Sequence, residues 1–276
     1  MQTAIDPDAK TPGQSLTPRS AHGPNWIGLW TLYLREVRRF WKVGAQTVAG
    51  PVVTTLLYMM IFAVAVNGAR TAVQGVSVAA FVGPGLIMMG ILNNAFANSS
   101  SSLFQAKINN TAPDFLTPPL SPLELTVGFS AGAMTRGILV GVVTAAAVWP
   151  FSHFGFAHLW AAAYFAFTAS LVMAATGVLA ALWAQKFDEL AAVTSFVVTP
   201  LTFLSGTFYL IDRLPEPFRT ISRFNPFFYL IDGFRYGFIG RAEGSLAIGA
   251  AASAALAAAL VFAVWRMFTT GWRLKS

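Results

Sequence analysis

Polar side chains interrupt two long apolar stretches and are the residues best placed to contact a solute. In the first stretch they recur at spacings of four and three residues, in the order Asn94, Asn98 and Ser101. This spacing puts them on one face of a helix. A polar face on a lipid-embedded helix must contact protein or water. It lines a path for a solute, or it joins helices by hydrogen bonds of roughly 0.6–2 kcal/mol each. Both interpretations stay open.

Arg136 lies about ten residues into the next apolar stretch, roughly 15 Å deep at the rise of a helix. An arginine there costs at least about 2.5 kcal/mol unless it is paired or hydrated. It faces a hydrated cavity and meets an anionic group of a substrate, or it forms a buried structural pair, or the stretch begins one turn later. Asp232 or a carbonyl of a broken helix is the expected partner. Gly128 and Gly132 share its ridge and allow another helix to approach.

Two sets of candidate site residues follow. The candidate translocation path consists of Asn94, Asn98, Ser101 and Arg136. The candidate gate consists of Asp232 and Arg235, which are three positions apart and can pair on one helical face. Such a pair serves structure or gating.

Nothing in the sequence predicts catalysis or metal binding. There is no Walker A sequence, no nucleophile elbow and no glycine-rich phosphate loop. The chain has no cysteine, and His22, His153 and His158 lack the spacing of metal ligands. We expect no catalytic residue, metal or cofactor in this chain. Energy for active transport must come from another subunit or from an ion gradient.

The composition predicts a membrane protein. The 276 residues are 55% hydrophobic and 11% charged, with a mean hydropathy of +0.60, whereas a soluble domain carries roughly 25% charged residues. Six apolar spans are expected, each near the roughly 20 residues that cross a bilayer. They cover residues 48–66, 76–102, 126–149, 159–184, 190–209 and 246–268. The net charge of +7 marks cytoplasmic span ends rather than a nucleic-acid surface.

The segment before the spans divides into a tail and a helix. Residues 1–25 contain no apolar core and are predicted to be a disordered cytosolic tail. Residues 26–43 alternate Trp and aliphatic residues with a basic face that includes Arg35, Glu36, Arg38 and Arg39. This pattern is typical of a helix lying in the membrane interface. The alternative is a core-facing helix of a small soluble domain.

Two polar interruptions of the spans have different expected roles. Residues 104–124 form a proline-containing loop whose Lys107, Asp114 and Glu124 belong in water. The distribution of Lys and Arg places this loop and both termini in the cytoplasm. On the other side, residues 227–240 are aromatic and apolar but too short to cross. They predict a re-entrant helical hairpin before the last span.

Several motifs together resemble a known family. The runs AFANSSSSLFQAK, DFLTPPLSPLE, KFDELAAVTSFVVTPLTFLSGTFY and NPFFYLIDGFRYGFIG resemble, in order and spacing, the permease subunits of the ABC-2 type exporter family. The resemblance extends from residue 26 onward. Its closest branch contains bacterial exporters of nodulation factors, polysaccharides and presumed drugs.

The resemblance implies an all-α membrane protein with the ABC-2, or type V, exporter fold: an interface helix, six transmembrane helices and a re-entrant hairpin. Residues 44–276 would form the six-helix permease domain. Two permeases, expected to be a homodimer in the bacterial inner membrane, would work with two ATP-binding subunits, which hold the ATP and Mg. A cytoplasmic coupling helix would contact the ATPase through Pro113, Asp114, Phe115, Leu116, Pro118 and Pro119. The cargo would be an amphipathic, glycan or lipid-type substrate.

Two other functions remain as alternatives. A gradient-driven secondary transporter would need inverted repeats and a membrane-embedded carboxylate, and the predicted spans have no central Asp or Glu. A non-transporting membrane scaffold needs neither. Dependence of an ATPase on this subunit separates the first function from both alternatives.

Overall fold

The computed structural model describes residues 23–66, 75–109, 111 and 120–271, and for residues 63–66 it describes the backbone alone. Within these ranges the chain forms helices joined by turns. The α-helices are α1 (Trp26–Trp41), α2 (Gly44–Val66), α3 (Val78–Ile108), α5 (Pro122–Ser152), α6 (Leu159–Trp183), α7 (Phe187–Val193), α8 (Thr199–Phe203), α9 (Phe218–Phe224), α10 (Pro226–Ile239) and α11 (Leu246–Thr270). The predicted all-α membrane fold is confirmed. The predicted tail lies almost wholly outside the described residues.

Five helices of the described part are long and apolar enough to cross a membrane: α2, α3, α5, α6 and α11. Their burial differs sharply. The most apolar windows of α3 and α6 are each 72% buried, against 17% for α2 and 22% for α11. The centre of the bundle is therefore α3 packed against α6, with the other helices around them. Most of the buried core residues belong to these two helices and to α10.

The fifth predicted span has an interrupted helix. α7 continues through a π-helical turn (Thr194–Val198) into α8, which ends at Phe203, so the helical run has 17 residues and a length of about 25 Å. Pro200 lacks a backbone N–H, and a π-helical turn immediately before it re-routes the hydrogen bonds. The predicted count of six crossing helices stays a prediction.

The helices around the predicted loop extend further than the sequence indicated. α3 continues to Ile108, and α5 begins at Pro122 behind the N-cap Ser121. The polar connection between the two helices is thus shorter than the predicted loop of residues 104–124. All six predicted coupling residues (Pro113, Asp114, Phe115, Leu116, Pro118 and Pro119) lie outside the described residues.

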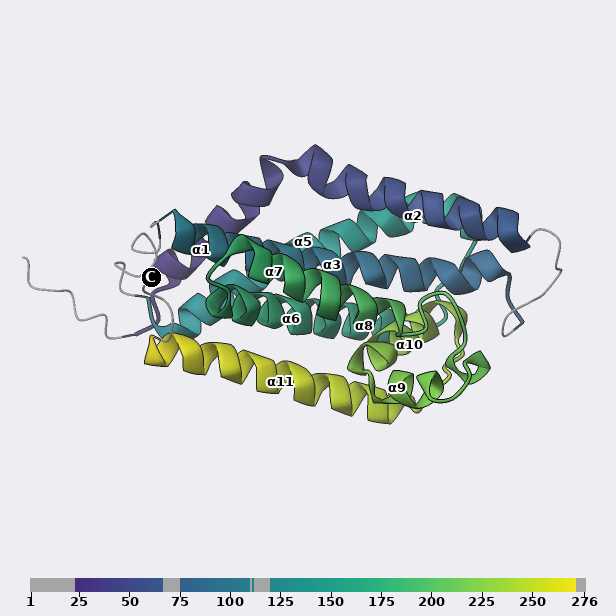
Figure 1. The fold of residues 1–276 in the computed structure, drawn as a ribbon. Helices are drawn as coiled ribbons and strands as arrows, with labels where there is room; N and C mark the ends of the chain where they lie inside the picture. The colour runs from purple at the N-terminus through teal and green to yellow at the C-terminus, as the bar shows by residue number, and fades with distance from the viewer. Residues whose placement is uncertain (1–22, 67–74, 110, 112–119, 272–276) are drawn as a thin grey trace, which may run out of the picture.

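The two ends of the bundle differ (Figure 1). α1, the last turn of α3, the start of α5 and the end of α11 lie together at one end, and α9 and α10 lie at the other. The predicted re-entrant segment is thus a pair of helices of 7 and 14 residues, joined at Asn225. α10 is largely buried against α3, α6 and α11.

Candidate functional site

α1 packs on α5 at two glycines. A Cβ atom added at Gly128 would overlap the side chain of Leu32, and one added at Gly132 would overlap that of Glu36. The glycine ridge predicted from the sequence therefore admits α1, which begins at the N-cap Asn25. The side of α1 that faces the bundle carries Leu32, Glu36 and Phe40, all buried.

The burial of Glu36 corrects the predicted polar face of α1. Its Oε1 accepts a hydrogen bond of 2.7 Å from the Ser102 hydroxyl of α3, and its Oε2 lies 3.6 Å from Nε of Arg39. Burial raises the pKa of Glu36, and the positive charge of Arg39 opposes this shift. The charge faces protein rather than water because Gly132 leaves room for it. Trp26, Trp30 and Trp41 are instead exposed.

Arg39 connects α1 to the predicted polar stripe of α3. Its Nη2 donates to the backbone carbonyl of Asn98 at 2.7 Å and to the Asn98 side-chain Oδ1 at 3.0 Å. Its Nη1 donates to the Ser101 hydroxyl at 3.3 Å. Burial lowers the pKa of Arg39, and the carboxylate of Glu36 opposes the shift. α1 thus contributes two charges to the contact with α3.

Among the described residues, Arg136 pairs with neither of the two partners predicted for it, Asp232 or a carbonyl of a broken helix. Its Nη2 donates to Oδ1 of Asn94 at 3.2 Å, across the contact between α5 and α3. Asp232 is not its partner: the Asp232 carboxylate accepts from the backbone N–H groups of Glu243 and Gly244 at the end of the bundle that holds α10. The sequence could not distinguish the two because the choice depends on which helix lies beside α5.

The structure therefore brings all four residues of the predicted path, Asn94, Asn98, Ser101 and Arg136, to one junction of α1, α3 and α5. We call these four residues, with Glu36, Arg39 and Ser102, the polar junction. Each of the four predicted path residues forms a hydrogen bond with a residue of another helix. None of them lines the three cavities described below. Their role in a path stays a prediction.

A second charged cluster surrounds Arg235 of α10, whose side chain is 1% exposed. Its Nη1 pairs with Glu243 at 3.3 Å, its Nη2 donates to the carbonyl of Gly206, and its guanidinium lies 3.9 Å from the ring centroid of Phe81. The predicted ion pair with Asp232 is wrong, since the capping N–H groups after α10 occupy that carboxylate.

Glu243 ties this cluster to a third segment. Its Oε2 accepts from the backbone N–H of Ile211 at 2.8 Å. Burial raises the pKa of Glu243 to about 7, an effect that the charge of Arg235 opposes. Arg235 and Glu243 together fasten the chain after α8 and the turn after α10 to α3. A gating role for Asp232 and Arg235 stays a prediction.

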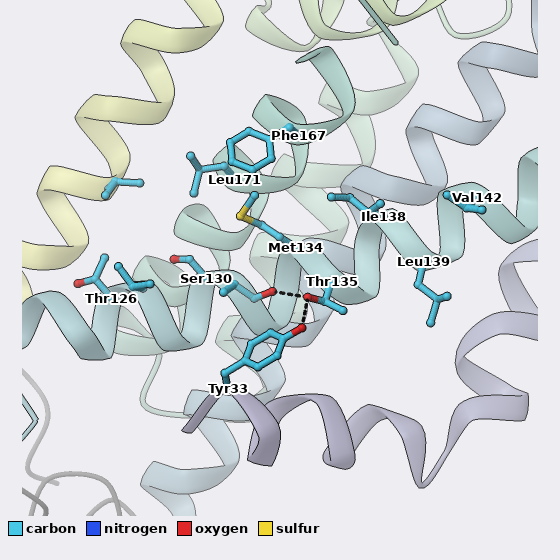
Figure 2. Close-up of a pocket in the computed structure, with 13 residues that line it drawn as sticks. Tyr33, Thr126, Ser130, Met134, Thr135, Ile138, Leu139, Val142, Phe167 and Leu171 are labelled. Atoms are coloured by element: carbon cyan, nitrogen blue, oxygen red, sulfur yellow. Dashed lines mark hydrogen bonds between the residues drawn. The ribbon is translucent and has the colours of Figure 1, made fainter. Parts of the chain in front are cut away.

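Three cavities lie beside α5. The largest, of about 850 Å³, is lined by α1, α5, α6 and α11 and is mostly apolar (Figure 2). At its edge the Tyr33 hydroxyl contacts the Thr135 hydroxyl at 3.1 Å. A second, of about 690 Å³, is lined by aromatic residues that include Trp149, Phe156 and Phe238. A small third one, of about 290 Å³, lies between α1 and α5.

Two charges at the ends of the polar connection were predicted to face water and instead bind protein. The Lys107 ammonium donates to three carbonyl oxygens at the end of α6, those of Ala181, Leu182 and Ala184, at 2.9–3.0 Å. Glu124 is 8% exposed and forms a capping box with Ser121. The S-x-x-E spacing is a known sequence signal for such a cap and could have identified Glu124.

Glu124 also joins α5 to α1. One carboxylate oxygen accepts from the backbone N–H of Ser121 at 2.6 Å, and the other accepts from the backbone N–H of Asn25, the N-cap of α1. Leu120 adds an apolar contact, because a Cβ atom added at Gly28 would lie 2.8 Å from its Cδ2. The start of α1 and residues 120–124, where the connection from α3 ends and α5 begins, therefore form one unit.

Comparisons with known proteins agree with this architecture. The sequence profile of the ABC-2 type transporter family matches residues 28–239. The inner membrane transport permease YadH of Escherichia coli K12 is 32% identical over 252 residues, which cover 91% of this chain and 98% of YadH. Nodulation protein J of Rhizobium leguminosarum bv. viciae is 27% identical, covering 80% of this chain and 85% of its own. Nodulation protein J of Rhizobium meliloti is 24% identical, with 78% and 81% covered. The chain therefore belongs to the ABC-2 type transporter family, as a membrane permease.

Proposed function

We propose that this chain is the permease subunit of an ATP-driven exporter in the bacterial inner membrane. Two copies would form a homodimer with two ATP-binding subunits and move an amphipathic, glycan or lipid-type substrate outward, with both termini in the cytoplasm. The family assignment and the name of the E. coli relative support the location and the role. The observation that carries the coupling mechanism is the unit formed by Glu124, Asn25 and Leu120.

That unit connects the predicted contact with the ATPase to the membrane helices. Lys107 fastens the last turn of α3 to the end of α6, and Glu124 fastens the first turn of α5 to the start of α1. Displacement of the intervening residues 109–121 would reach four helices at once. ATP-driven closure of the partner subunits would thus move α1 together with the bundle, rather than bend a loose loop.

Exposure of α2 is consistent with a second copy of the chain. Val53, Leu57, Met60 and Ile61 each expose at least half of their surface, and little of the helix is buried within the single chain. Lipid could cover this face, but an α2 packed against its own copy would place two polar junctions in one assembly. Cysteine crosslinking at Leu57 tests this arrangement in membranes; absence of a dimer band at Leu57 and at Val53 would contradict it.

The coupling experiment uses the permease co-expressed with its ATP-binding subunit. The double substitution Phe115→Glu, Leu116→Glu should abolish co-purification of the ATPase, because charged side chains oppose apolar seating in a groove. The matched control is Ile221→Glu, Phe224→Glu, which adds the same charges on exposed residues of α9 at the other end of the bundle. Retained co-purification in the first variant, with a monodisperse permease, would refute the predicted contact.

A second measurement separates the exporter from the alternatives. ATP turnover by the partner should depend on the permease if the two form one transporter. A secondary transporter or a scaffold would leave the turnover unchanged. If no ATP-binding protein associates with the wild-type chain and its turnover is independent of it, the proposed function is wrong.

A further inference from the structure

The polar junction contains more hydrogen-bond donors than acceptors. The junction holds two guanidinium groups and one carboxylate: Arg39 lies 3.6 Å from Glu36, and Arg136 donates to Asn94. Arg35 adds a further positive charge that acts on both Glu36 and Arg39. Buried charges in proteins are ordinarily paired. The junction therefore carries an excess of positive charge between three helices.

Each asparagine of the junction accepts from one arginine through its side-chain carbonyl oxygen. Oδ1 of Asn98 accepts from Arg39, and Oδ1 of Asn94 accepts from Arg136. Because Arg39 fixes the orientation of the Asn98 amide, the amide nitrogen must point elsewhere. Asn98 is fully buried, and its Nδ2 has no hydrogen-bond partner within the described part of the chain.

A second donor is also unused. The Nε of Arg136 is buried and has no hydrogen-bond partner among the described residues; the same holds for the Nε of Arg39 and the Oε2 of Glu36, which lie 3.6 Å apart. The guanidinium of Arg136 also repels that of Arg39. Asn94 and Asn98 are one helical turn apart on α3, so the unused donors belong to neighbouring positions of the junction. A water molecule could accept hydrogen bonds from these donors, but it could not balance the excess positive charge of the junction. A negatively charged group with several oxygens accepts the hydrogen bonds and also balances the charge.

We propose that the polar junction binds a phosphate oxyanion. Guanidinium forks match the oxygen geometry of phosphate, and amide N–H groups supply further neutral donors. Arg39 retains 28% side-chain exposure, so the junction is open on the side of α1. The phosphate belongs to the headgroup of an anionic phospholipid or to free phosphate. The site does not depend on the proposed export function.

The test measures binding by the full-length chain in detergent solution. Phosphatidylglycerol, phosphatidylcholine and inorganic phosphate are titrated separately, with retained lipid counted by native mass spectrometry and the thermal midpoint measured in parallel. Both phospholipids carry a phosphate, but only phosphatidylglycerol has a net negative headgroup. A response to phosphatidylglycerol above phosphatidylcholine identifies lipid as the source. A response to inorganic phosphate identifies the soluble anion.

Arg136→Gln tests the assigned residues. Loss of one charge-assisted contact should weaken the bound phosphate about tenfold or more. Arg136→Lys keeps the charge without the fork and should recover part of the affinity. Arg266→Gln removes the same charge from an exposed position on α11 and should leave binding unchanged. Asn98→Leu should weaken binding as well, since it removes the unused amide donor.

Each outcome decides the proposal. Preference for phosphatidylglycerol or a response to phosphate, reduced in Arg136→Gln and retained in Arg266→Gln, supports it. The proposal is wrong if the wild-type chain prefers neither ligand, or if Arg136→Gln and Arg266→Gln bind equally. If Arg136→Gln does not fold, Arg136→Lys and Asn98→Leu decide in its place. Failure of ATPase co-purification would leave this result unaffected.

Discussion

Replacing Glu124 by alanine should loosen the start of α1 while the bundle stays folded. The carboxylate accepts two backbone N–H groups, one from Ser121 at its own helix start and one from Asn25 at the start of α1. Alanine removes both acceptors, and at 8% exposure the site admits little water to replace them. Only the bond to Asn25 crosses between helices.

The magnitude follows from that single bond. A hydrogen bond to a charged group contributes about 1.5–3 kcal/mol. A loss of about 2 kcal/mol changes the equilibrium for opening roughly 30-fold. The first amides of α1 depend on the position of Asn25: Gly28 N–H donates to its side chain, and Leu29 N–H donates to its carbonyl, both at 2.9 Å. Their hydrogen exchange should accelerate by about this factor if it proceeds through local opening.

Hydrogen exchange with mass spectrometry measures this effect on a peptide that covers the start of α1. Glu124→Gln is the graded control, because glutamine keeps one acceptor oxygen and turns an NH₂ group toward the other donor. Its exchange should lie between wild type and Glu124→Ala. A peptide from the buried middle of α6 should exchange as in wild type.

Two results would refute the reasoning. Unchanged exchange at the start of α1 in Glu124→Ala would mean that the bond to Asn25 contributes nothing. Equal acceleration in α6 would mean that the substitution destabilises the whole bundle instead of one contact. In the complex with the ATPase, Glu124→Ala should also lower permease-dependent ATP turnover while co-purification is retained, since the predicted contact at residues 113–119 stays intact.

Three further substitutions test the packing and the buried charges. Gly177→Ala places a Cβ 2.6 Å from the carbonyl of Phe96 and should lower the free energy of unfolding by about 1–3 kcal/mol. Gly155→Ala is the control, because a Cβ atom there meets open space and should not lower it. Equal thermal midpoints for the two variants would contradict this packing. Lys107→Met leaves three carbonyls at the end of α6 without their donor and should lower the thermal midpoint, and a midpoint as in wild type would show that water replaces the ammonium. Burial raises the pKa of Glu243 to about 7, so the stabilising contribution of this group is present below about pH 4.5 and is lost as the pH rises through 7. Glu243→Gln should remove this part of the pH dependence of the thermal midpoint. An unchanged slope of the midpoint against pH would refute the shift.

The sequence predicted the long helices well because their signal is local. Length and hydropathy identify a span without reference to its neighbours, and five of the six predicted spans agree with single helices longer than 20 residues. The helix predicted at residues 26–43, from the alternation of Trp with basic residues, is present as α1 at residues 26–41, and its place in the membrane interface stays a prediction. The fifth span was less regular than hydropathy suggested, because Pro200 acts through the backbone.

The candidate site shows the limit of local reasoning. The spacing of Asn94, Asn98 and Ser101 placed them on one face, and this face does exist as a unit. The pair predicted from proximity in sequence is wrong, because Arg235 pairs with Glu243 rather than Asp232, and Arg136 donates to Asn94 rather than pairing with Asp232. Ion-pair partners depend on the packing of distant segments, which one sequence does not reveal.

The sequence by itself determined that this is a helical membrane permease of the ABC-2 type, since composition, span lengths and ordered motifs are properties of the chain alone. Only the tertiary structure decided what the polar stripe of α3 contacts. Gly128 and Gly132 remove the side chains that would have kept α1 away from α5, and this space lets Glu36 and Arg39 reach α3. The physical reason is that a glycine contributes to packing through the atoms it lacks, so its effect appears only when a neighbouring helix is in place.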